Sequence, residues 1–223
     1  GQSSKVSIML ATDHGNVAAS GFASKMTGQT IGLGFGTSFG AARLDLGFTS
    51  GVEKVSGTRS GQSFSNAKMS GSSVMARLTL APLAGITPFF GLSRSNGTMD
   101  AIAETGTGAN LNVASFSQSL SLAEVGAEYS YKLSDKVTLG VTAAYEHDLG
   151  NNPQGISASF ADAASPTAFT VNTYGFGKDQ FRGGLNFKAV LSESSSAGLS
   201  YEVRSGNGVK SASELKLNYT CRF

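Results

Sequence analysis

The sequence is poor in the residues that disulfides, metal sites and charged soluble surfaces require. Its 223 residues include one cysteine, two histidines, four prolines and no tryptophan, and only 14% of them are charged. A single cysteine, Cys221, excludes an internal disulfide and a zinc site built from several cysteine ligands. Soluble domains carry about 25% charged residues. The chain therefore lacks the charge density that a water-exposed surface normally has.

A basic cluster and a long apolar run are missing too. The formal net charge of +2, without a Lys/Arg-rich stretch, argues against nucleic-acid binding. The most apolar window, residues 78–92, is interrupted by Pro82, Gly85 and Pro88 and is shorter than the roughly 20 residues of a transmembrane helix. The N-terminal stretch GQSSKVSIML has no long apolar core, so we expect a mature or excised segment.

What the sequence has in abundance is strict alternation of apolar and polar residues. In the last thirteen residues, Leu215, Leu217, Tyr219, Cys221 and Phe223 share one parity, and polar residues share the other. Successive strand side chains point to opposite faces, so this pattern predicts a strand with one apolar and one polar face. Ten segments have such alternation or a β-rich composition: 16–26, 28–39, 40–52, 70–82, 85–97, 116–133, 136–149, 178–191, 195–206 and 211–223.

The connections between these segments fall into two length classes that alternate along most of the chain. The short ones lie around Gly40 and at 82–84, 134–136 and 192–196, and the long ones lie at 53–69, 98–115 and 150–177, although 205–210 is brief. Short turns at one end and long loops at the other are typical of a transmembrane barrel. We therefore predict one domain, a barrel over residues 16–223. Residues 1–15 are expected to be either a first strand, with Val6, Ile8 and Leu10 on one face, or a segment inside the lumen.

Alternation alone does not say which face is outside, because a soluble barrel buries its apolar face and a membrane barrel exposes it. Three features favour the membrane. Charge on the polar face is diluted by Gly, Ser and Thr; the segments are about 12 residues long, as a tilted membrane strand requires; and Tyr129, Tyr131, Tyr145, Tyr219 and Phe223 lie near strand ends, where interfacial aromatic girdles occur. A hydrocarbon core offers no water to an open sheet edge, so such a barrel must close.

In this orientation the charged residues of the polar face point into the lumen. Seven are basic and seven acidic, which predicts cross-strand ion pairs rather than a pore of one sign. The predicted lumen-lining residues are Arg43, Asp45, Arg77, Glu124, Glu128, Glu146, Asp148, Arg182, Lys188, Glu202, Arg204, Glu214, Lys216 and Arg222.

The chain resembles the C-terminal translocator domain of bacterial autotransporters. The resemblance rests on ITPFFGL, on LAEVGAEYSYKLSDKVTLGVTAAYEHDLG, on ISASFADAASPTAFTVNTYGFGKDQFRGGLNF, and on the closing GLSYEVRSGNG and LKLNYTCRF. It implies a 12-stranded outer-membrane barrel, a helical segment in the lumen and an exported N-terminal passenger. It also implies that the terminal strand, with Tyr219 and Phe223, is the signal read by the barrel-assembly machinery. Periplasmic chaperones and outer-membrane lipid are further implied partners, and we expect a monomer.

This chain departs from the family pattern in two respects. It is shorter than a complete translocator domain usually is, and residues 1–27 contain no obvious pore helix. The leading hypothesis is a translocator and membrane anchor for a passenger. The alternative is a small porin that acts on its own.

Motifs that would indicate catalysis are weak. The stretch GTSFG at 36–40 matches G-x-S-x-G, with Ser38 as the nucleophile, but that motif needs a following helix, whereas a second strand is expected here. His14 and His147 are far apart in sequence, so neither a metal site nor a catalytic pair is expected; a base within Glu146–Asp148 is the less favoured interpretation. A hydrolase on the barrel wall is the most remote hypothesis. We predict no enzymatic activity, no cofactor and no nucleic-acid partner.

Overall fold

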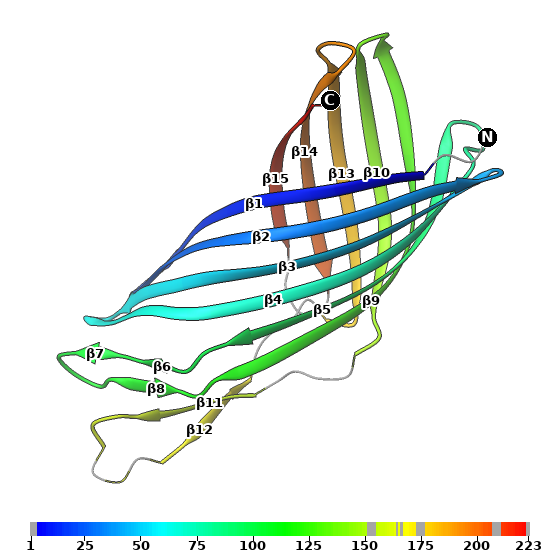
Figure 1. Cartoon of the computed structure of the whole chain (residues 1–223). Coiled ribbons are helices and arrows are strands. Elements are labelled where there is room, and N and C mark those ends of the chain that lie inside the picture. Colours follow the sequence, from blue (N-terminus) through cyan, green and yellow to red (C-terminus); the bar gives the residue numbers. More distant parts are fainter. Residues whose placement is uncertain are drawn as a thin grey trace.

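The structure is a computed structural model that describes residues 4–150, 155–163, 165, 167–172, 177–206 and 211–221. Ten long strands form one sheet: β1 (Ser4–Ala19), β2 (Phe22–Phe39), β3 (Ala42–Arg59), β4 (Gln62–Leu80), β5 (Ile86–Met99), β9 (Phe116–Ser134), β10 (Val137–Asp148), β13 (Asp179–Val190), β14 (Ser195–Gly206) and β15 (Ala212–Cys221). Each pairs antiparallel with the next in that order, and Figure 1 shows the sheet strongly curled. The prediction of an all-β, antiparallel, up-and-down fold is confirmed.

Short strands lie in the two longest connections of the sheet. They are β6 (Ile102–Ala103), β7 (Thr105–Gly106), β8 (Leu111–Val113), β11 (Gly155–Phe160) and β12 (Phe169–Asn172). Strand β7 pairs with β4, and the other four form a second sheet in the order β12-β11-β8-β6. These strands lie beyond the ends of β5 and β9 in Figure 1, at the opposite end from both termini. We call this end the loop end, and we call the other end the turn end.

Two of the expected boundaries are wrong, both near the loop end. The predicted loop at 53–69 is a continuation of β3 and β4, which reverse at Ser60 and Gly61 with φ of 47° and 93°. The predicted strand at 16–26 contains the turn at Ser20 and Gly21, while β1 begins at Ser4 and runs across residue 15. The hydrophobic pattern fades at both places because the strand pairs continue past the apolar band, so alternation no longer marks them.

The apolar parity of the long strands is the exposed face of the sheet. Leu217 is 84% exposed, Leu10 79%, Val6 72% and Phe181 65%. An apolar band on this scale is unstable in water and is the surface that a membrane barrel turns to lipid. Within the described residues, β1 and β15 are the two edges of the sheet and no pairing joins them. The family number of twelve strands therefore stays a prediction.

A small hydrophobic core lies at the loop end, on the opposite face from the apolar band. Val55, Ala67 and Met99 are buried there, and Phe64 and Ile102 pack against them. This core joins the tip of the β3–β4 hairpin to the connection that follows β5. It explains why the hairpin stays ordered beyond the apolar band.

Candidate functional site

The polar face of β9, β10, β13 and β14 carries a connected cluster of charged side chains. Arg182 on β13 is its centre: Nη2 contacts Glu124 Oε1, Nε donates to Glu146 Oε1 at 2.8 Å, and Nη1 donates to Glu202 Oε2 at 3.0 Å. Arg204 adds ion pairs to Glu202 at 3.2 Å and to Glu146 at 3.7 Å. Because the Glu146 side chain is only 5% exposed, it depends on these two guanidinium groups for its charge compensation.

A second group on the same face links β4, β5 and β9. Arg77 Nη2 donates to Glu128 Oε1 at 2.5 Å, and its guanidinium carbon lies 3.7 Å from the centre of the Phe89 ring. Phe89 is 0% exposed and lies over Gly126, where even a methyl group would collide with the ring. Figure 1 shows β5 between β4 and β9, so the arginine reaches its carboxylate partner across an intervening strand.

Such contacts between alternate strands show which way the sheet curls. Arg77 reaches from β4 to Glu128 on β9, and Arg182 reaches from β13 to Glu124 on β9. Alternate strands lie about 10 Å apart, and side chains converge only on the concave face of a curled sheet. Small residues on the intervening strand leave room, as Ala144 does on β10, in register with Arg182.

Five more of the predicted lumen-lining residues make only local contacts. Arg43 pairs with Asp45 on the same strand at 2.6 Å, and Lys216 pairs with Glu214 at 2.8 Å. Asp148 accepts a hydrogen bond from the Gly150 amide at 2.8 Å.

Two of the fourteen residues are not part of these contacts. Lys188 has no ion pair among the residues that the structure describes. Arg222 lies outside the described residues, as does Phe223.

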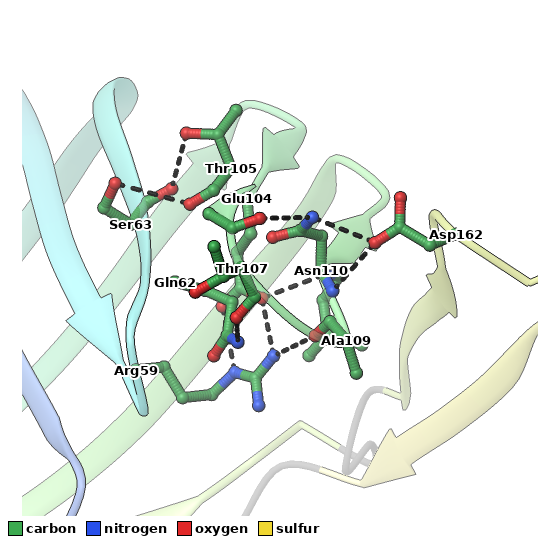
Figure 2. A network of polar contacts seen from close by, with 11 residues as sticks. Arg59, Gln62, Ser63, Glu104, Thr105, Thr107, Ala109, Asn110 and Asp162 are labelled. Carbon is green, nitrogen blue, oxygen red and sulfur yellow. Dashed lines mark hydrogen bonds and ion pairs between the residues drawn. The ribbon is translucent and has the colours of Figure 1, made fainter.

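Figure 2 shows a polar network at the loop end that the sequence analysis missed. Arg59 Nε and Nη2 donate to the two Glu104 carboxylate oxygens at 2.9 and 2.6 Å, and the Leu111 amide donates to Glu104 at 2.9 Å. These bonds lower the pKa of Glu104, with the Arg59 hydrogen bond as the largest cause, and raise the pKa of Arg59. Asn110 Nδ2 in turn donates to Asp162 at 2.9 Å, so the network joins the hairpin tip to both long connections.

The sequence held weak signals for these missed residues. Phe89 lies in FF, where consecutive aromatic residues must point to opposite faces, yet only Phe90 fitted the apolar parity. Arg59 and Glu104 lie 45 residues apart, and the expected loop at 53–69 concealed their proximity.

The motifs considered for catalysis do not assemble. Ser38 precedes the turn from β2 into β3, so no helix follows it. Glu146 lies on the polar face, whereas His147 points to the opposite face. There its Nδ1 lies 2.9 Å from the Asp179 carboxylate, which also accepts a hydrogen bond from the Tyr145 hydroxyl. Within the described residues there is no group of metal-ligating side chains, and no helix is long and apolar enough to cross a membrane.

Comparisons with known proteins identify the family of the chain. The family model described as "Autotransporter beta-domain" matches residues 1–202. The fold is similar to the translocator domain of the autotransporter NalP from Neisseria meningitidis, with a TM-score of 0.71 and 19% identity over 99% of this chain and 74% of that chain. The β-domain of the Bordetella autotransporter BrkA gives a TM-score of 0.49 and 14% identity over 98% of each chain. A search of curated proteins finds no match.

The fold and the exposed apolar band define the class of an outer-membrane β-barrel. The chain belongs to the autotransporter β-domain family, as the resemblance in its sequence indicated. It is an outer-membrane translocator and anchor domain of a bacterial autotransporter, and no comparison supports the alternative of a stand-alone porin.

Proposed function

We propose that the polar face lines a lumen through which an N-terminal passenger is exported or held at the cell surface. The observation that carries this proposal is the set of ion pairs between alternate strands, such as Arg77 with Glu128, because only a concave face allows them. A wall of paired charges is hydrophilic without strong net charge, so it favours neither sign in an extended polypeptide. The fourteen predicted lumen-lining residues belong to this proposal.

The assembly route is a second part of the proposal. The final strand, with Tyr219 and Phe223, is the segment that the barrel-assembly machinery recognises after periplasmic chaperones have kept the chain unfolded. Tyr219 is 66% exposed on the apolar parity, which supports a role for its ring in contact with lipid or with another protein. We propose that the domain acts as a monomer and without enzymatic activity.

The N-terminal part of the chain completes the proposal. Residues 1–15 were expected to be either a strand or a segment inside the lumen, ahead of a barrel over 16–223. The pairing of β1 with β2 from Ser4 onward supports a place in the wall. Both edge strands must find backbone partners in a bilayer, because hydrocarbon offers none.

Cysteine labelling in vesicles tests which face lines the lumen. Neighbouring positions on β14, Ser200 and Leu199, point to opposite faces and provide a matched pair after Cys221→Ser. A membrane-impermeant maleimide should label Ser200→Cys through the lumen, and a lipid-soluble reagent should prefer Leu199→Cys. The reverse pattern would overturn the proposed orientation.

Surface display tests export. A reporter passenger fused ahead of the domain should become accessible to external protease in intact cells. Single-channel conductance should be low while an upstream segment occupies the lumen, and should rise when that segment is removed. Equal conductance with and without the segment, combined with a reporter that stays in the periplasm, would contradict the translocator function.

A further inference from the structure

The outward face of β1–β5 carries charge of one sign only. The outward parity includes Lys25, Lys54, Lys68 and Arg94, with His14 beside them, and no aspartate or glutamate. The inward parity of the same strands mixes both signs. Acidic residues are therefore excluded from one face and not from the other.

Three of these basic residues form a compact group with His14, which we call the outer basic cluster: His14, Lys25, Lys54 and Lys68. Lys54 on β3 is directly opposite Lys68 on β4. On its other side Lys54 is opposite Thr27 on β2, and Thr27 is in turn opposite His14 on β1. Like charges directly opposite each other destabilise a strand pair. None of the three lysines has an ion pair within the described part of the chain, and each is exposed. An external anion would relieve their repulsion.

The position of the cluster relative to the apolar band indicates where that anion lies. Along β3 and β4, from the turn end toward the loop end, the apolar pair Phe48 and Val74 comes first on the outward face. The pair Ser50 and Ser72 follows, and then the pair Val52 and Ser70. The next outward pair is Lys54 and Lys68. Lys54 is twelve residues from the start of β3 at Ala42. At a strand tilt of about 40°, this places it about 30 Å along the membrane normal, just beyond an apolar band about 25 Å tall. Because the long loops of such barrels lie outside the cell and the short turns in the periplasm, this is the level of the outer-leaflet headgroups.

A hollow of about 600 Å³ lies directly beside the cluster, on its membrane side. In each of three strands it contacts three consecutive residues, for example Leu10 to Thr12 on β1 and Ser50 to Val52 on β3. The first and third of each trio have the outward parity, so the hollow opens on the lipid-facing side. Its lining combines aliphatic groups with hydroxyl and amide groups, which suits the junction between an acyl chain and its headgroup.

We propose that the outer basic cluster and this hollow bind a phosphate-bearing lipid of the outer leaflet, with the phosphate between Lys54 and Lys68 and the lipid body in the hollow. The occupant is a lipid rather than free phosphate because the cluster is continuous with the lipid-facing band and the hollow lies on the membrane side of the charges. Asp100, whose amide donates to the Lys68 carbonyl at 2.9 Å, is an acidic residue that follows the end of β5. It makes no ion pair with Lys68 within the described residues.

The test compares two variants that lose the same charge. Lys54→Gln/Lys68→Gln removes the lysine pair, and Lys132→Gln/Lys136→Gln removes two lysines at the turn end. Each is refolded as the full chain into phosphatidylcholine vesicles with a minor fraction of phosphatidic acid. The lipid retained after transfer to detergent is then measured by mass spectrometry. We expect about thirty-fold lower enrichment of phosphatidic acid for the first variant, as two lysines near an anionic surface would cause, and wild-type enrichment for the second.

Further variants separate the parts of the site. Lys54→Arg/Lys68→Arg should keep the enrichment, whereas Ser50→Trp should lower it by filling the hollow without a change of charge. Free phosphate in excess should not displace the lipid. Equal enrichment in both glutamine variants, or displacement by free phosphate, would overturn the proposal. The inference depends on the membrane orientation of the apolar face: failure of the wild type to insert would refute that orientation, while insertion without lipid preference would refute this inference alone.

Discussion

Replacement of Arg182 by methionine should destabilise the barrel more than any other single loss of charge on its polar face. The variant leaves Glu124, Glu146 and Glu202 without their shared guanidinium, in a cluster where the arginine side chain is 12% exposed and Glu146 is 5% exposed. Removal of one partner from a buried ion pair lowers the free energy of unfolding by about 3–5 kcal/mol. Arg204 stays near two of the three carboxylates, so we expect the lower end, about 3 kcal/mol, which is about a hundred-fold in the folding equilibrium.

The measurement is urea unfolding in phospholipid vesicles, followed by far-ultraviolet circular dichroism and by gel mobility, because the chain contains no tryptophan. Lys188→Met is the matched control: the residue lies on the same strand and the same face, is exposed, and has no ion pair among the described residues. Lys188→Met should lower the free energy of unfolding by less than about 1 kcal/mol, as is usual for the loss of an exposed charge. Addition of Glu146→Gln to Arg182→Met should recover part of the loss. Equal costs for Arg182→Met and Lys188→Met, or a strictly additive double variant, would refute the cluster as a cooperative unit.

Three further predictions concern other parts of the molecule. Phe89→Ala should lower the free energy of unfolding by about 3–4 kcal/mol, because the ring is fully buried on the polar face. Phe90→Ala, at the neighbouring outward position, should lower it less. The opposite order would mean that Phe90, not Phe89, is the buried ring. The pKa of Glu104 is lowered by its arginine partner, so its stabilising contribution is present above the ordinary carboxyl range and is lost as pH falls through the lowered pKa. The protection factor of the Leu111 amide in hydrogen exchange, which corrects for the intrinsic pH dependence of exchange, should therefore fall on acidification, and Glu104→Gln should make that protection low and independent of pH. Deletion of Phe223 should lower the amount of protein in the outer membrane; normal membrane levels would contradict the assembly signal.

The residues that sequence analysis identified correctly are those whose environment repeats every two positions. Leu215, Leu217 and Tyr219 mark the apolar face of β15, and the same alternation recurs on the neighbouring strands. The presence of a strand and the identity of its apolar face therefore follow from the local alternation of apolar and polar residues. The boundaries near Ser20 and Ser60 were misplaced because pairing between strands continues where the apolar pattern stops. Hydrogen bonds to the adjacent strand hold the backbone there, and those bonds leave no mark on alternation.

The sequence by itself determined that this chain is a β-protein with one apolar and one polar side, since side-chain direction on a strand depends only on parity. Tertiary structure decided which charges meet. Arg182 with its three carboxylates, Arg59 with Glu104, and Lys54 opposite Lys68 are brought together by strand register and by the curl of the sheet. Register arises from the summed pairing of whole strands, so a shift of two residues would keep every face the same and change every partner.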